Sequence, residues 1–171
     1  ETGYLLEHPN LVRYMGWGED DKGPFLLQEY VDGKTLGEFL AENRGYFDNQ
    51  DNEQKYITQI LSGLGFLHSH QVVHLDLKPD NILITRIGQE VKLIDLGCCY
   101  SDTFADTAGL NRDFAAPEQL HSSERFQPAP QTDLYALGKV LEWLAMKKGC
   151  RLTKAEHRLT KALLKARVED R

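Results

Sequence analysis

The stretch HLDLKPDN at residues 74–81, followed by the β-rich ILI at 82–84, says most about the fold of this chain. Within it, Asp76 and Asn81 are five positions apart and Lys78 lies between them. Pro79 and the polar neighbours predict a loop that leads directly into a strand. A carboxylate, an ammonium group and an amide are therefore expected close together at the start of a buried strand.

A second acidic residue, Asp95, follows directly on another β-rich run, 91–94. Phosphoryl transfer needs such a set, because its transition state spreads negative charge over the oxygens of the transferred group. One carboxylate, Asp76, can orient a hydroxyl nucleophile and accept its proton, and Lys78 can meet the developing charge. Asn81 and Asp95 offer the oxygen ligands that Mg²⁺ prefers.

Length and composition limit what the chain can be. Its 171 residues, 41% of them hydrophobic, are enough for one domain with one sizeable core. A net charge of −6 gives no general attraction to nucleic acid, so no nucleic-acid partner is expected. No apolar run approaches the ~18 residues of a membrane span, so no membrane segment is expected. Three cysteines without CxxC spacing fit reduced thiols and favour a cytoplasmic location.

Hydrophobic periodicity and turn residues predict the elements along the chain. They are strands at 11–16 and 25–31, a helix from about 51 to 70, a hairpin of strands 81–84 and 91–94, a long loop at 97–112, and helices at 134–146 and from 153 to about 166. The run 134–146 is apolar almost all round, so its helix is expected at the centre of the domain. Thr35 with Glu38, and Thr153 with Glu156, have the spacing of a capping box.

A few strands followed mostly by helices predict an α+β fold that is mainly α. Trp17 and Trp143 are both expected in the core.

The chain resembles the protein kinase family, most of all its Ser/Thr branch. The likeness rests on HLDLKPDN at 74–81, DLG at 95–97 and APE at 116–118, in that order, and is supported by HPN at 8–10, LLQEYVDG at 26–33 and TDLYALG at 132–138. The resemblance implies a kinase-like large lobe with a remnant of the β-rich small lobe. It also implies transfer of the γ-phosphoryl group of ATP, with Mg²⁺, to a Ser/Thr hydroxyl of a protein substrate.

By resemblance, Asp76 is the catalytic base, Lys78 faces the phosphates, and Asn81 and Asp95 are the metal ligands. Asp133 resembles the buried aspartate that holds the catalytic loop through backbone N–H groups.

The resemblance also implies a nucleotide-binding edge. Gln28 is the expected gatekeeper, the backbones of Glu29 and Val31 are expected to bind adenine, and Leu83 is expected beneath the ring.

By the same resemblance, the APE glutamate Glu118 should pair with Arg171. Two positions depart from the family. Leu75 replaces the arginine that usually binds an activation-loop phosphate, and Asn111 stands near the usual place of a threonine that touches the catalytic aspartate.

The resemblance divides the chain into a small-lobe remnant with the hinge, 1–31, and a large lobe truncated at its C-terminal end, 32–171. Neither a G-x-G-x-x-G loop in strand context nor a VAIK-like lysine occurs in this sequence. We therefore expect a segment of a longer kinase; the alternative is a catalytically impaired, pseudokinase-like binding scaffold. A small-molecule kinase is disfavoured, because Lys78-Pro79 resembles protein kinases specifically.

Eight lysines and arginines lie between residues 147 and 167. They could dock an acidic partner, although a solvated basic helix face is the more common reason for such a run.

Overall fold

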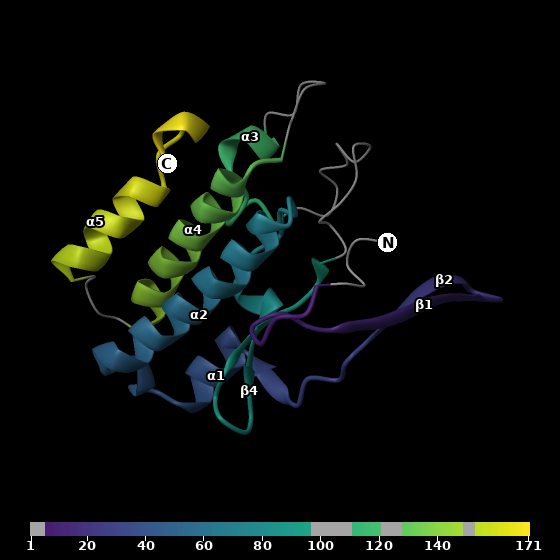
Figure 1. Cartoon of the computed structure of the whole chain (residues 1–171). Coiled ribbons are helices and arrows are strands. Elements are labelled where there is room, and N and C mark those ends of the chain that lie inside the picture. Colours follow the sequence, from purple (N-terminus) through teal and green to yellow (C-terminus); the bar gives the residue numbers. More distant parts are fainter. Residues whose placement is uncertain (1–5, 97–110, 121–127, 149–152) are drawn as a thin grey trace.

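The structure is a computed structural model of the chain, and it describes residues 6–96, 111–120, 128–148 and 153–171. The elements follow in the order β1 (Tyr14–Asp20), β2 (Gly23–Gln28), β3 (Gly33–Thr35), α1 (Leu36–Glu42), η2 (Tyr46–Asp48), α2 (Gln50–Ser69), η3 (Pro79–Asn81), β4 (Ile82–Thr85), β5 (Val91–Leu93), α3 (Pro117–Leu120), α4 (Pro130–Lys148), α5 (Lys154–Leu163) and η6 (Val168–Asp170). Figure 1 shows α4 between α2 and α5, while the β1–β2 hairpin extends away from the helices. The predicted α+β, mainly α, class is confirmed.

Helices α2 and α4 lie antiparallel and are joined at both ends. Glu53, near the start of α2, meets Lys148 at the end of α4, with 2.5 Å between Oε2 and Nζ. His68, near the end of α2, meets Asp133 at the start of α4, with 2.8 Å between Nε2 and Oδ2. Polar contacts at the two ends therefore fix the register of this helix pair.

Helix α4 lies at the centre of the domain, as predicted, and buries a run of small and branched side chains: Ala136, Leu137, Val140, Leu141 and Leu144. Gly138 allows α5 to approach closely, since a Cβ there would lie 2.9 Å from Leu164 Cδ2. None of the helices in the described part of the chain is long and apolar enough to cross a membrane.

Both predicted capping boxes are present. The Glu38 N–H donates to Thr35 Oγ1 while the Glu38 carboxylate accepts the Thr35 N–H, which starts α1. Thr153 and Glu156 repeat this arrangement at the start of α5. Each box satisfies two N–H groups that a helix start would otherwise leave without a partner.

Two antiparallel sheets carry the strands. One is the β1–β2 hairpin alone, and the other has the order β3–β4–β5. The predicted hairpin around Gly88 is confirmed as β4 and β5, with Gly88 at φ +79° in the turn. The second sheet packs against the helices, with β3 and β4 in contact with α1 and β5 in contact with α2.

The prediction of a first strand at residues 11–16 is wrong in part. Leu11 forms a bridge with Leu93, and the Val12 N–H donates to the Leu93 carbonyl at 2.8 Å, so both residues run beside β5. Each is at most 1% exposed. Strand β1 begins only at Tyr14, because Leu11 and Val12 pair with β5 and not with β2.

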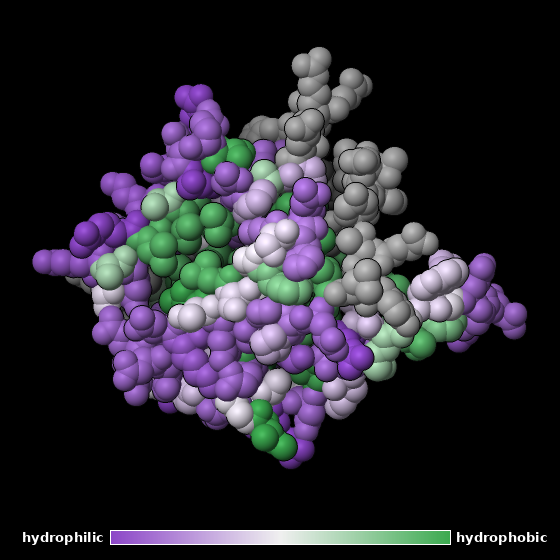
Figure 2. Space-filling model, in the orientation of Figure 1, coloured by the Kyte–Doolittle hydropathy of each residue, from purple (hydrophilic) through white to green (hydrophobic). Residues whose placement is uncertain are grey.

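The expectation that Trp17 lies in the core is also wrong. Its side chain is 70% exposed on the β1–β2 hairpin, beside other exposed apolar residues of the two strands: Met15, Phe25, Leu26 and Leu27. Figure 2 shows this apolar surface on the projecting hairpin. A two-stranded sheet has no second layer of its own to cover its faces, so these side chains stay in solvent. Trp143, in contrast, packs against the core.

Candidate active site

A buried aspartate holds the loop that carries the candidate cluster. The Asp133 side chain has no exposed surface, and its two oxygens accept the backbone N–H groups of His74 and Leu75, each at 2.8 Å. Leu75 has a φ of +65°, and its carbonyl accepts the Gln119 side-chain amide at 2.9 Å. The role predicted for Asp133 is confirmed, because these bonds fix the backbone immediately before Asp76.

Three of the four predicted catalytic residues meet at one carboxylate. Lys78 Nζ lies 2.6 Å from Asp76 Oδ2, and Asn81 Nδ2 donates to the same oxygen at 2.9 Å. Asn81 Nδ2 also donates to the Asp76 backbone carbonyl at 2.8 Å. The side chains of Asp76 and Lys78 are 11% and 19% exposed, so the cluster is sheltered but reachable. Asp76 can accept a proton there while the ammonium group stays next to it.

The fourth residue, Asp95, is brought alongside Asn81 through the backbone. The Ile94 N–H donates to the Asn81 carbonyl at 3.0 Å, and the next residue, Asp95, has a φ of +61° and is exposed. The Leu96 N–H donates to the Tyr14 hydroxyl at 3.0 Å. The chain therefore turns sharply at Asp95 between two fixed neighbours.

Asn81 and Asp95 fit a magnesium ion by their chemistry. The Asn81 amide nitrogen is directed at Asp76, which leaves the amide oxygen as a possible ligand on its other side. Among the described residues, no group of three or more His, Cys, Asp or Glu side chains could hold a metal ion. Magnesium commonly takes only one or two protein oxygens and completes its shell with water and phosphate oxygens, so a two-residue site suits it.

The predicted adenine-binding residues flank the same sheet. Gln28 is the last residue of β2. Together with Glu29 and Val31 it belongs to the segment 28–32, called the hinge segment below, which leads from β2 to β3. Strand β3 pairs with β4, in which Leu83 is half-buried. Because β4 begins directly after Asn81, the sheet connects the hinge segment to the metal-ligand end.

Comparisons with known proteins show the family of this chain. The family described as "Protein kinase domain" matches residues 3–168. The chain belongs to the protein kinase family. The chain is 36% identical over 142 residues to Serine/threonine-protein kinase ppk25 of Schizosaccharomyces pombe, and the match covers 81% of the chain and 33% of that protein. It is 33% identical over 146 residues to Serine/threonine-protein kinase PrkC of Bacillus subtilis, with coverage of 82% and 22%. The chain thus spans between about a fifth and a third of the length of its relatives.

In this kinase domain, the predicted ion pair between Glu118 and Arg171 is confirmed. Arg171 Nη1 and Nη2 lie 2.6 and 2.9 Å from the two carboxylate oxygens, and the Arg171 side chain has no exposed surface. Burial raises the pKa of Glu118, but the hydrogen bonds and charge of Arg171 outweigh it, so the pKa is lowered. Thr132 Oγ1 donates to the same carboxylate at 3.1 Å, which joins α3 to the start of α4.

Asp76 contributes to the lining of a small hollow in the kinase domain. Asn111, Phe114 and Ala136 line it together with the catalytic loop. Asn111 Oδ1 accepts the Asp113 N–H at 3.1 Å, so the side chain is held at the edge of the hollow. The structure thus places Asn111 and Asp76 on the lining of the same hollow.

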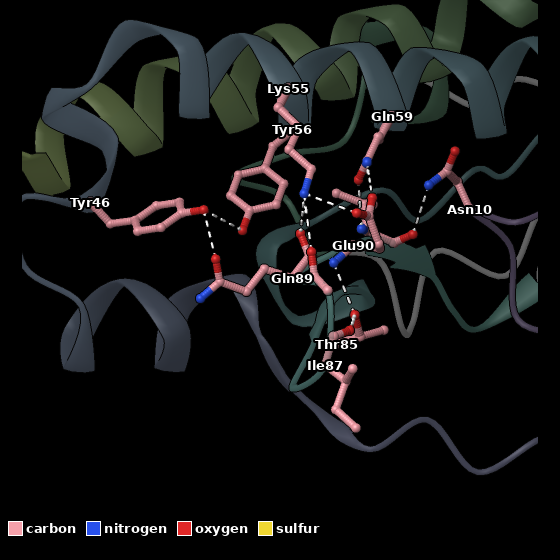
Figure 3. A network of polar contacts seen from close by, with 11 residues as sticks. Asn10, Tyr46, Lys55, Tyr56, Gln59, Thr85, Ile87, Gln89 and Glu90 are labelled. Atoms are coloured by element: carbon pink, nitrogen blue, oxygen red, sulfur yellow. Dashed lines mark hydrogen bonds and ion pairs between the residues drawn. The ribbon is translucent and has the colours of Figure 1, made fainter.

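The turn of the β4–β5 hairpin is tied to α2 by a polar network that the sequence patterns did not indicate (Figure 3). Lys55 Nζ donates to the Gln89 carbonyl at 3.1 Å and meets Glu90 Oε1 at 3.0 Å. Gln59 binds the Glu90 carboxylate, and its Oε1 accepts the Val91 N–H at 2.7 Å. The closed end of the hairpin is therefore fixed, while its open end carries the candidate metal ligands.

Sequence reasoning also missed Gln119, which connects the APE segment to the catalytic loop. Its Oε1 accepts the Ala116 N–H at 2.9 Å and its amide donates to Leu75. Gln119 directly follows the APE motif, and this position was the only available signal. Several features of the sequence analysis lie outside the described part of the chain: Gly97 of the DLG motif, residues 97–110 of the predicted loop, and the three cysteines, Cys98, Cys99 and Cys150.

Proposed function

We propose that this protein is a Ser/Thr protein kinase, which transfers the γ-phosphoryl group of Mg-ATP to a hydroxyl group of a protein substrate. The observation that carries the proposal is the convergence of Lys78 and Asn81 on one oxygen of Asp76. In the Ser/Thr branch, which this chain resembles, a lysine stands two residues after the catalytic aspartate. The Ser/Thr kinases among its relatives support the same reading.

We assign each residue of the cluster a role, which the contacts among Asp76, Lys78 and Asn81 support. Asp76 is among the residues that line the hollow, and its carboxylate orients the substrate hydroxyl and accepts its proton. Lys78 neutralises the charge that develops on the transferred group. Asn81 and Asp95 would hold the Mg²⁺ ion, which neutralises the phosphate oxygens when it is bound.

We assign the adenine-binding role to Gln28, Glu29, Val31 and Leu83. The connection of the hinge segment to β3, and of β3 to β4, supports this assignment. It also supports a division into residues 1–31, with the small-lobe hairpin, and residues 32–171, with the large lobe. The two parts carry separate sheets.

The proposal is tested by incubating the purified full-length protein with labelled Mg-ATP and casein, and by mapping the phosphorylated residues by mass spectrometry. We expect phosphoserine and phosphothreonine, and no transfer when EDTA removes Mg²⁺. Transfer to tyrosine alone, or transfer that persists without a divalent cation, would contradict the assignment.

The alternative is a pseudokinase-like scaffold, and two observations favour it. Leu75 stands in place of the family's arginine that binds an activation-loop phosphate. Asn111, which lines the hollow, has a side-chain amide near the place where the family usually has the hydroxyl group of a threonine. The scaffold would be supported by two results together. The folded full-length protein would transfer no phosphate to any substrate, and it would bind its partners only when it is folded.

Helix α5 presents a basic stripe that we propose as a docking site for an acidic peptide segment. Lys154, Arg158 and Lys161 are exposed, and their spacing places them on one side of the helix. None of the three forms an ion pair within the part of the chain that the structure describes. Residues 147–167 carry eight cations and one acid, a net charge of +7, so the other residues together carry −13.

A fluorescent decaglutamate peptide is expected to bind the protein with an affinity that falls steeply as salt rises. Changing the three cations to glutamate should abolish this binding, while changing Lys34 to Glu on another surface should leave it intact. Equal binding by both variants, measured by fluorescence anisotropy, would show that the stripe is only a solvated helix face.

We also propose a cytoplasmic location, which the three cysteines without CxxC spacing support.

A further inference from the structure

The ammonium group of Lys92 joins three segments of the chain. Its Nζ lies 2.6 Å from Glu29 Oε1 in the hinge segment and donates to the Leu11 carbonyl at 3.1 Å. The same Glu29 oxygen accepts the Arg13 N–H at 3.0 Å, and the Glu29 N–H donates to the Arg13 carbonyl at 2.8 Å. The side chains of Lys92 and Glu29 are 20% and 31% exposed, so this contact is more sheltered than most surface ion pairs.

Lys92 occupies a position between the two ends of the proposed nucleotide site. It is paired with Leu83 across β4 and β5, so its side chain lies on the same face as the residue assigned beneath the adenine ring. It is also three residues before Asp95, on the strand that leads to that carboxylate. The Lys92–Glu29 link therefore connects the adenine end of the site to β5, which leads to the proposed metal ligand Asp95.

The link adds a side-chain contact to a backbone that is hydrogen-bonded at both ends, by the Glu29 N–H to the Arg13 carbonyl and by the Arg86 N–H to the Asp32 carbonyl. The ladder between β1 and β2 ends at Tyr14 and Gln28, and the Glu29 carboxylate prolongs it by accepting the Arg13 N–H. Burial raises the pKa of Glu29, but the hydrogen bonds from Lys92 and from the Arg13 backbone outweigh it and lower the pKa. Glu29 is accordingly a carboxylate at neutral pH and a strong acceptor for both donors.

We propose that Lys92 is a positioning residue for the nucleotide: through Glu29 it fixes the hinge backbone relative to β5, the strand that leads to Asp95. This inference rests on the kinase function proposed above. In the proposed site, the adenine ring contacts the backbone of the hinge segment. A hinge segment that moves relative to β5 should therefore weaken nucleotide binding more than it slows phosphoryl transfer. The effect belongs to binding, because neither Lys92 nor Glu29 touches the reacting atoms.

The test uses four variants of the full-length protein: Lys92→Met, Glu29→Gln, the double variant, and Lys92→Arg. Lys139→Met is the matched control, because Lys139 pairs with Glu142 at 2.8 Å on α4, away from the hinge segment. Calorimetry measures the Kd of adenosine, which reads the hinge without phosphates or metal. Steady-state kinetics separate KM for ATP from kcat, and hydrogen exchange reports on the amides of residues 29–31.

We expect Lys92→Met to raise the Kd of adenosine and the KM for ATP about tenfold, with kcat changed less than about threefold. Exchange at residues 29–31 should become faster. The double variant should bind adenosine as well as Lys92→Met does, because each of the two changes breaks the same link. Lys92→Arg should restore most of the affinity, and Lys139→Met should behave as the wild type.

Two results would overturn the inference. One is an unchanged adenosine Kd in Lys92→Met, and the other is a loss of kcat without a change in binding. If Lys92→Met does not fold, Glu29→Gln decides the question, since it keeps the ammonium group and the shape of the side chain. A wild-type protein that binds neither adenosine nor ATP would instead refute the proposed function, which keeps the two failures distinct.

Discussion

The Asp76→Asn variant of the full-length protein is expected to lose about 10²–10⁴-fold in kcat for phosphoryl transfer. Within the described residues, Asp76 is the only carboxylate that Lys78 and Asn81 both contact, and it is among the residues that line the hollow. Asparagine keeps the shape and one oxygen for these donors, but its amide cannot accept the proton of the hydroxyl. Turnover of a Ser/Thr substrate, measured at saturating ATP, checks this expectation.

Asp80→Asn is the matched control for this variant, because Asp80 is an exposed acid of the same loop and has no role in the cluster. Both variants should unfold at the wild-type temperature and bind ATP with similar affinity. Equal turnover by Asp76→Asn and the wild type would remove Asp76 from the role of base and, with it, the main support for the proposed enzyme.

The Lys148→Met variant is expected to lose about 3–5 kcal/mol of unfolding free energy at neutral pH. The Lys148 and Glu53 side chains are only 11% and 4% exposed, and their contact joins the two central helices. Without the ammonium group, a carboxylate remains buried and unpaired. Urea unfolding, followed by circular dichroism, measures the loss.

The same variant should respond to pH in a defined direction. Burial raises the pKa of Glu53, Lys148 opposes this, and Glu156 adds to the increase, so the pKa should rise further when Lys148 is removed. A carboxyl group whose pKa is higher in the folded than in the unfolded protein does not reduce stability at a pH below its unfolded pKa. The loss of stability grows as pH rises from the unfolded to the folded pKa, and then stays constant. The difference from the wild type should therefore be smaller at about pH 5 than at about pH 8.

Changing both residues, as Glu53→Gln with Lys148→Met, should recover much of the loss, because no charge then remains buried. A Lys148→Met variant as stable as the wild type at both pH values would mean that Glu53 finds water or another donor, and that the pair contributes nothing to the helix packing.

The parts of the site that are close in sequence could be predicted from the sequence alone. Asp76, Lys78 and Asn81 lie on one short loop before a strand, so their mutual contacts need little beyond local geometry. The capping boxes at Thr35 and Thr153 were likewise predictable, because a cap involves residues three positions apart.

Contacts between distant segments were predictable only where a family resemblance supplied them. Glu118 and Arg171, 53 residues apart, are of this kind. The links of Lys92 to Glu29 and of Lys55 to the β4–β5 turn had no such support, since a lone lysine in a strand or helix fits a solvated side chain equally well. Trp17 was misplaced because its burial depends on what covers the hairpin, which the strand pattern does not specify.

The sequence by itself determined which chemical groups this protein brings to a site, the local loop that presents three of them, and the starts of two helices. Apart from the contacts that the resemblance supplied, only the tertiary structure decided which distant partner a polar group meets and which apolar face remains in solvent. The reason is physical: local hydrogen bonds follow from spacing along the chain, whereas burial and long-range pairing depend on how separate elements pack, and packing is a property of the whole fold.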